Sequence, residues 1–129
     1  MIEIKIKTTS RNQMLDITSE VSKHIPDGFS GLAFLYVPHT TAGITINEGA
    51  DPSVKNDILN HLAELIPYSG RYTHMEGNSD AHIKSSLIGN SINIIVRDGG
   101  IVLGTWQAVF FCEFDGPRNR KVYLNLVGK

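Results

Sequence analysis

Three histidines of the 129-residue chain stand in short polar stretches that could do chemistry. The stretches are PHTTAG around His39, THMEGNSD around His74 and SDAHIKSS around His82. Three neutral imidazoles can hold a divalent transition metal such as zinc and leave one coordination position for water or a substrate. No HExxH or paired-cysteine motif accompanies them. The spacing alone therefore also fits three unrelated histidines that only make hydrogen bonds.

The stretch SDAHIKSSLIG predicts a short helix over about 80–88, ended by Gly89. At about 100° per residue, one face of this helix carries an imidazole and small residues, while two apolar residues point toward the core. The first set is His82, Ser85, Ser86 and Gly89, and the apolar pair is Ile83 and Leu87. Such a face suits the close approach of a ligand or, equally, tight packing against another backbone.

Several residues are candidates for binding a phosphate. They are the hydroxyls of Thr40 and Thr41, the N-terminal amides of the helix that starts near Ser79, and Arg118 after a Gly-Pro turn. The chain has no Walker loop and no GxGxxG motif. Arg118 could equally stabilise its turn or a subunit contact. If the three imidazoles converge too loosely for a metal, we expect them to donate hydrogen bonds to the same phosphate.

Composition narrows the function classes. The chain has 12 basic and 13 acidic residues with neither sign in a block, which argues against nucleic acid as a partner because phosphates call for a basic excess. Cys112 is the only cysteine, so an intramolecular disulfide is excluded, and we expect a buried thiol. The N-terminus MIEIKIK alternates charge with isoleucine and predicts neither a signal peptide nor a membrane span. We expect a cytoplasmic protein without a membrane partner.

The elements that position these residues follow from periodicity. Alternating or continuous apolar runs predict strands, and the spacing of three to four predicts helices. The expected strands are 2–7, 31–37, 43–47, 92–96, 101–114 and a last one through 122–126, and the expected helices are 17–25, 52–66 and 80–88. Asp51-Pro52 reads as an N-cap followed by proline at the first helical position. The order predicts an α+β fold, a single domain over 1–129 with antiparallel sheets and two to three helices.

One core is expected in a chain of this size. The strand 101–114 is expected to pair with 92–96 in a hairpin, to turn its even-numbered apolar side chains toward the core and to carry polar groups near its ends. The side chains expected to be buried are Ile4, Leu35, Ile58, Leu62, Ile94, Trp106, Phe110 and Leu124.

Three blocks that together span most of the chain resemble the YjbQ-like family, also called the secondary thiamine-phosphate synthase family. They are PHTTAGITINEGADPSV (38–54), HMEGNSDAHIKSSLIG (74–89) and LGTWQAVFFCEFDGPRNR (103–120). The resemblance implies an antiparallel α+β subunit that assembles as a homotrimer around a polar pocket. The pocket residues it implies are His39, Thr40, Thr41, Glu48, His74, Glu76, Asn78, His82, Ser85, Gln107, Asp115 and Arg118.

The activity implied by the resemblance joins an aminopyrimidine methyl diphosphate to a thiazole phosphate and releases diphosphate. Arg118, the Thr40 and Thr41 hydroxyls and a bound cation would stabilise the leaving group, and Glu48 or Asp115 would hold the reactive pyrimidine near the thiazole nitrogen. Asn78, Ser85 and Gln107 would bind substrate, and His39, His74 and His82 would hold zinc or, with a diphosphate, magnesium. The other class left open is a trimeric metal- or phosphometabolite-binding protein with no physiological catalysis.

Overall fold

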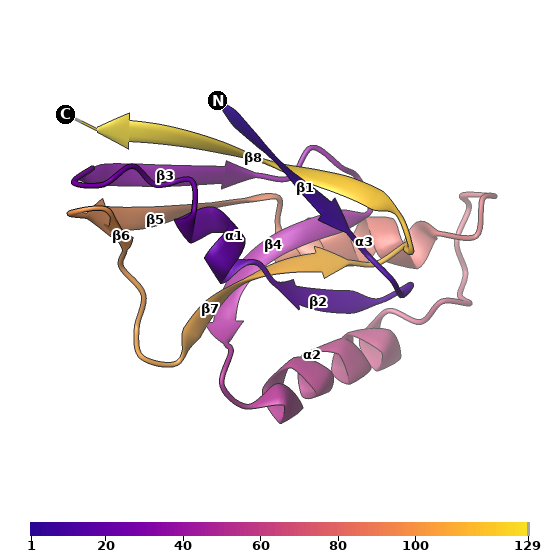
Figure 1. Cartoon of the computed structure of the whole chain (residues 1–129). Coiled ribbons are helices and arrows are strands. Elements are labelled where there is room, and N and C mark those ends of the chain that lie inside the picture. The colour runs from indigo at the N-terminus through magenta and orange to yellow at the C-terminus, as the bar shows by residue number, and fades with distance from the viewer. Residues whose placement is uncertain (129) are drawn as a thin grey trace.

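The computed structural model describes residues 1–128 and consists of two antiparallel sheets and three helices (Figure 1). A five-stranded sheet has the order β1 (Ile2–Lys7), β8 (Asn119–Gly128), β3 (Gly31–Tyr36), β5 (Ser91–Arg97) and β6 (Gly100–Ile101). A three-stranded sheet has the order β2 (Gln13–Asp16), β7 (Gln107–Glu113) and β4 (Ala42–Glu48). All strand pairs are antiparallel, so the predicted α+β architecture is confirmed.

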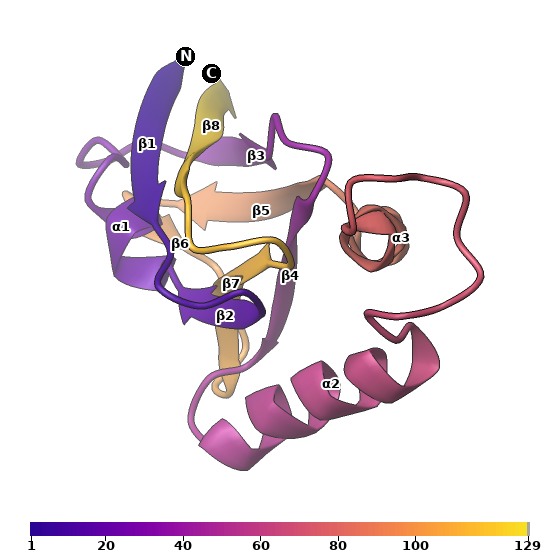
Figure 2. The ribbon, with the colours of Figure 1, turned by 90° about the vertical axis from the view of Figure 1, so that its right-hand side faces the viewer.

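The helices begin and end where the sequence predicts, within a few residues. Helix α2 (Pro52–Leu65) has Asp51 as its N-cap, whose carboxylate accepts from the amide of Ser53 at 2.9 Å. Helix α3 (Ser79–Ile88) ends at Gly89, whose φ of 98° favours glycine. Helix α1 (Thr18–Ser22) is a short turn after Ile17. Turned by 90°, the molecule shows α3 end-on beside β4, with α2 below it (Figure 2).

Strand β7 is the centre of the core because it is buried on both faces. Val109 and Phe111 pack into a cluster with the inner side chains of the five-stranded sheet. Phe110, Cys112 and Phe114 pack into a second cluster with Met14 and with Leu62 and Ile66 at the end of α2. Cys112 is the buried thiol that the sequence predicts, and burial raises its pKa to about 12.

The predicted strand 101–114 is wrong in its first half. Residues 102–106 form a loop that carries the chain from the five-stranded sheet to the three-stranded one, so only Gly100–Ile101 pair with β5. Trp106 lies in this loop and its surface is 64% exposed, which corrects the expectation that it is buried. Apolar residues continue on both sides of Gly104-Thr105, so the pattern was interpreted as one strand and the crossover was missed.

Helix α3 faces the core with a different side than predicted. Ile83 and Leu87, expected inside, are exposed at 44% and 60%, while Asp80, Lys84 and Ser85 are buried. Ile58 of α2 is only half-buried, whereas the other six residues expected in the core are buried as predicted: Ile4, Leu35, Leu62, Ile94, Phe110 and Leu124. Within residues 1–128 no helix has both the length and the apolar character needed to cross a membrane.

Candidate functional site

Two loops and helix α3 meet at one end of the three-stranded sheet. The first loop, 37–41, joins β3 to β4, and the second, 114–118, joins β7 to β8. The amide of Phe114 donates to the carbonyl of Thr41 at 3.2 Å, which ties the loops together. The hydroxyl of Ser85 on α3 donates to the carbonyl of Thr40 at 2.5 Å, which ties the helix to the first loop. The resulting surface contains most of the polar residues singled out by the sequence.

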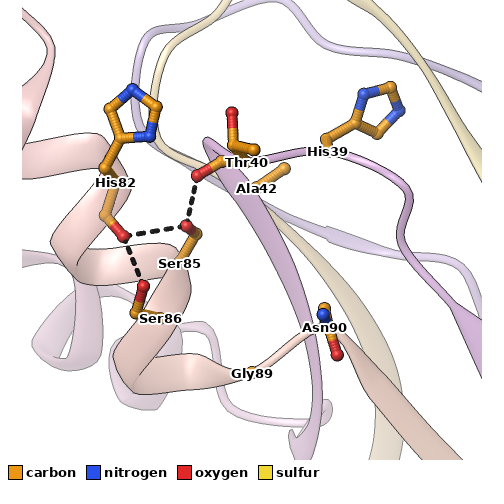
Figure 3. Close-up of a pocket in the computed structure, with 8 residues that line it drawn as sticks. All are labelled: His39, Thr40, Ala42, His82, Ser85, Ser86, Gly89 and Asn90. Atoms are coloured by element: carbon orange, nitrogen blue, oxygen red, sulfur yellow. Dashed lines mark hydrogen bonds between the residues drawn. The ribbon is translucent and has the colours of Figure 1, made fainter.

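The first concavity on this surface, here called the α3 cavity, has a volume of about 520 Å³ (Figure 3). It is lined by His39, Thr40, Ala42, His82, Ser85, Ser86, Gly89 and Asn90. His39 and His82 stand on either side of Thr40 in the close-up. The predicted helix face of His82, Ser85, Ser86 and Gly89 therefore does line a cavity. Its two serine hydroxyls are engaged with the backbone, since Ser86 also bonds to the carbonyl of His82, at 2.9 Å.

The second concavity, here called the arginine cavity, measures about 380 Å³ and shares His39, Thr40 and His82 with the first. Its other lining residues are Pro38, Thr41, Glu76, Asn78, Asp115, Arg118 and Arg120. Both volumes lie in the range of about 300–1,000 Å³ typical of small-molecule sites. The structure thus brings together nine residues of the predicted pocket, counting Ser85: His39, Thr40, Thr41, Glu76, Asn78, His82, Ser85, Asp115 and Arg118.

His39 is held in one orientation by the backbone of β8. The amide of Lys121 donates to its Nε2 at 3.0 Å. Burial and then the positive charge of Arg120 lower the pKa of His39 below its ordinary value of 6.5. The ring is therefore neutral at pH 7, and because Nε2 accepts, Nδ1 carries the proton. His39 presents a hydrogen-bond donor to the cavities.

A buried ion pair holds Arg120, which lines the arginine cavity. Arg120 donates to both carboxylate oxygens of Glu113, with Nε 2.8 Å from Oε1. The hydroxyl of Thr8 and the amides of Phe114 and Asp115 also donate to this carboxylate, at 2.8, 3.1 and 3.0 Å. Burial alone would raise the pKa of Glu113, but these donors outweigh it and lower the pKa. Glu113 is thus a fixed anion that orients Arg120.

A second buried network lies behind the N-terminus of α3. Asp80 is fully buried. Its carboxylate accepts hydrogen bonds from Nη1 and Nη2 of Arg11, at 3.0 and 3.1 Å, and from the ammonium group of Lys84 at 3.0 Å. Burial would raise the pKa of Asp80, and these two cations outweigh it and lower the pKa. The guanidinium of Arg11 stacks over the ring of Tyr68 at 4.3 Å. This network, rather than Ile83 and Leu87, fixes the rotation of α3.

Asp115 connects both networks to the cavity rim. Its carboxylate accepts from the side-chain amide nitrogen of Asn78 at 3.0 Å and from Nη2 of Arg118 at 3.1 Å. Nη2 of Arg11 approaches the same carboxylate to 3.9 Å. Arg118 also donates to the carbonyl of Asp115, so this arginine does stabilise its own turn. About half of its side chain stays exposed and lines the cavity. The turn-stabilising interpretation of Arg118 is therefore confirmed, and its binding of phosphate stays a prediction.

His74 lines neither of the two cavities. Its ring packs edge-to-face on His82 with the centroids 5.2 Å apart, and its Nε2 lies 3.8 Å from Glu76. It lines a groove of about 420 Å³ that His82 shares, together with Arg71, Tyr72, Thr73, Ser79 and Ile83. Among residues 1–128, no three His, Cys, Asp or Glu side chains are grouped so that they could hold a metal ion. Because Nε2 of His39 is already engaged, one chain does not fit a three-histidine zinc site, and the metal assignment stays a prediction.

Glu48 and Gln107 lie at the opposite end of the sheet. They face each other as the last pair of the β4–β7 ladder, whose first pair is Ala42 and Glu113. Both side chains accept from nearby backbone amides, Glu48 from Ala50 at 3.1 Å and Gln107 from Gly104 at 2.8 Å. Neither lines the two cavities.

Sequence reasoning missed Arg120, a buried cation that lines the arginine cavity. A signal was present, because Arg120 has the same parity as Val122 and Leu124, so its side chain had to point into the molecule. Glu113 similarly follows Val109 and Phe111 on one face of β7. An arginine and a glutamate at inward positions of consecutive strands predict a buried pair.

Comparison with known proteins matches almost the whole length of the chain to one family. Residues 2–129 match the family described as UPF0047 protein YjbQ-like. The chain belongs to the YjbQ-like UPF0047 family. The UPF0047 protein of Methanocaldococcus jannaschii is 55% identical over 130 residues, covering 99% of this chain and 94% of that protein. YugU of Bacillus subtilis is 52% identical, covering 97% of each chain.

Solved structures of YjbQ-like proteins have the same fold. A YjbQ/UPF0047-family protein from Clostridium acetobutylicum superposes with a TM-score of 0.94 at 50% identity, covering 98% of this chain and 100% of that one. A conserved hypothetical protein from Thermus thermophilus gives a TM-score of 0.94 at 43% identity, with the same coverage. The resemblance inferred from the three sequence blocks is therefore confirmed as family membership.

Proposed function

We propose that the two cavities bind the phosphate group of a small metabolite. The observation that carries this proposal is the convergence of hydrogen-bond donors on the arginine cavity, from the side chains of Thr40, Arg118, Arg120 and His39. Guanidinium groups and hydroxyls are the usual protein ligands of phosphate oxygens. The carboxylates of Asp115 and of the buried Glu113 each pair with an arginine, and Glu76, the other carboxylate that lines this cavity, lies 3.8 Å from Nε2 of His74.

The reaction implied by family resemblance suits such a site. In a thiamine-phosphate synthase type of transfer, the bond between the pyrimidine methyl carbon and the diphosphate oxygen breaks, and the diphosphate leaves with the bonding electrons. The thiazole nitrogen then supplies the electron pair for the new carbon–nitrogen bond. Donors preset around the departing diphosphate would stabilise its developing charge. Asp115, held at the rim, would stabilise the pyrimidine cation.

Two measurements on the purified full chain test the proposal. Calorimetric titration with inorganic phosphate, diphosphate and thiamine phosphate measures binding, and chromatography of thiamine phosphate measures turnover of the two heterocyclic substrates. Arg118→Gln should weaken binding by about 10-fold, the loss expected for one charged hydrogen bond. Arg97→Gln, which alters an exposed arginine at the far end of β5, is the matched control. Binding without turnover would favour the alternative, a phosphometabolite-binding protein, and no binding would overturn the proposal.

The homotrimer is also part of the proposal. The outer face of the five-stranded sheet supports self-association because apolar side chains are neighbours there across three strands, with Leu32 opposite both Ile95 and Val127. These three are exposed, as are Phe34 and Tyr36 of the same strand. Light scattering at micromolar concentration should give three times the 14.2 kDa chain mass. A monomer under those conditions would contradict the trimer without affecting the phosphate site.

A further inference from the structure

Arg120 has one amino group left for a ligand. Its side chain is only 6% exposed, and Nε and Nη2 are used by Glu113 and by the hydroxyl of Thr41, the latter at 2.8 Å. Nη1 makes no hydrogen bond to any side chain or backbone group of residues 1–128. In that same range the one enclosed side-chain atom without a partner is Oδ1 of Asn78, so Nη1 is not enclosed. Arg120 lines both the arginine cavity and a groove beside β1 and β8. Because Nη2 of the same guanidinium bonds to Thr41, which lines the arginine cavity and not the groove, we infer that Nη1 faces the arginine cavity.

The orientation of Arg120 is fixed before any ligand arrives. Glu113 has no exposed surface and accepts hydrogen bonds from Thr8 and from two backbone amides in addition to the guanidinium. A carboxylate held by that many donors cannot swing away without leaving buried polar groups unpaired. Arg120 therefore needs no reorganisation to present Nη1.

The next residue of β8 fixes a second donor. The amide of Lys121 occupies Nε2 of His39, so Nδ1–H is the polar group of that ring left for a ligand. Both His39 and Arg120 line the arginine cavity. Two consecutive residues of β8 thus supply the two donors of this cavity. Arg120 supplies its own guanidinium, and the backbone amide of Lys121 orients the ring of His39.

We propose that Nη1 of Arg120 and Nδ1–H of His39 together bind one tetrahedral oxyanion of the ligand, with Glu113 as the positioning residue of Arg120. The inference rests on the proposed function and names the anchor of its phosphate group. Arg120 is balanced by Glu113, so recognition depends on the direction of the donors more than on net charge. A phosphate ester or the end of a diphosphate presents oxygens that two donors on different walls can share.

Nuclear magnetic resonance on the wild-type protein labelled with ¹⁵N tests this directly. Adding inorganic phosphate should shift the Nδ1 signal of His39 and the guanidinium signals of Arg120, while those of Arg97 stay in place. If phosphate binds but shifts signals of other residues only, the inference is wrong and the proposed function stands. If calorimetry detects neither phosphate nor diphosphate binding, both are wrong.

Variants extend the test. Arg120→Lys should weaken phosphate binding by about 10- to 100-fold, the range for a hydrogen bond to a charged group, and Arg97→Lys should not change it. Among variants of His39, asparagine places an amide nitrogen near the position of Nδ1, whereas glutamine reaches toward that of Nε2. His39→Asn should therefore retain more affinity than His39→Gln. Equal affinity for these two would contradict the role of Nδ1.

The role of Glu113 has its own readout. In Glu113→Gln the guanidinium signals of Arg120 should broaden or move before phosphate is added, and affinity should fall. Adding Arg120→Lys to that variant should then cost little more, because both changes remove the same interaction. Losses that add fully in the double variant would show that Glu113 does not act through Arg120.

Discussion

The two ends of the β4–β7 ladder carry polar residues in opposite ways. At the end where Ala42 faces Glu113, the carboxylate is buried and bonded to groups from Thr8, Arg120 and the following loop. At the other end, Glu48 and Gln107 accept only from amides two or three residues away and stay accessible. Six residue steps of about 3.3 Å separate the ends by about 20 Å.

The family resemblance implies one pocket that contains residues of both ends. Within one copy of the chain, however, Glu48 and Gln107 lie far from the two cavities. The first end is preorganised, because its donors are fixed by buried partners before a ligand binds. The second end stabilises its own turns and has side chains free to meet a group from outside the chain. Polar residues at the two ends of the same strands should therefore differ strongly in how much their substitution lowers the free energy of unfolding.

The largest effect is expected for Glu113→Gln. Removing the charge leaves Arg120 buried without its counterion, and breaking such a pair costs about 3–5 kcal/mol of unfolding free energy. Urea denaturation followed by circular dichroism measures the change, with Glu48→Gln at the accessible end as the matched control. A loss in Glu113→Gln no larger than in the control would mean that the two ends do not differ.

Acid should act on the preorganised end next. The pKa values of Glu113 and Asp80 lie below their ordinary values of 4.5 and 3.8, so their contribution to stability is fully present above those values. As pH falls below about 4.5 and then through the lowered folded-state values, the unfolded chain binds protons first and the free energy of unfolding decreases. Urea titrations between pH 7 and 2.5 should show this decrease, and Asp80→Asn should show a shallower one. Equal slopes for the two proteins would contradict the assignment to Asp80.

His39 should respond at higher pH and in the same direction. Its folded pKa is lowered from 6.5, so the unfolded chain takes up a proton first as pH falls through about 6.5, and stability declines toward the folded value. In the neutral state Nδ1–H remains a donor, so phosphate affinity should not fall between pH 7 and 8 through titration of this ring. Calorimetry with diphosphate between pH 7 and 8 tests this prediction. If binding required the doubly protonated imidazolium form of His39, the affinity for diphosphate would fall in this range.

How far the sequence could predict this site depends on the kind of signal. The caps Asp51 and Gly89 act through the local backbone, and both helix ends were predicted from them. The rotation of α3 about its axis was not predicted. It depends on the ion pair between Asp80 and Arg11, which lie 69 residues apart in the sequence, and this pair turns a charged face of the helix inward instead of an apolar one. Strand β7 is apolar on both sides, so its start at Gln107 left no mark in the periodicity.

Trp106 shows the same limit as a smaller measurable effect. Had it been buried as the pattern predicts, Trp106→Ala would cost about 3–5 kcal/mol. With 64% of its surface exposed in the loop before β7, the cost in the isolated chain should stay below about 1 kcal/mol. Urea denaturation of the dilute protein separates these values. A cost of about 3 kcal/mol or more in the dilute protein would contradict the exposed position of Trp106.

The smallest effect is expected at the accessible end of the ladder. Glu48→Gln and Gln107→Ala remove only local contacts to Ala50 and Gly104, and surface changes of this kind usually alter stability by less than about 0.5 kcal/mol. Phosphate affinity should also stay within about twofold, since neither residue lines the cavities and about 20 Å of strand lies between them and Glu113. Calorimetry at protein concentrations above and below that at which the assembly dissociates makes the test decisive. An unchanged affinity at both concentrations keeps the two ends functionally separate. A loss of tenfold or more that appears only in the associated protein would mean that Glu48 or Gln107 enters the cavity of a neighbouring copy, and the comparison between the ends would then hold for one chain but not for the assembly.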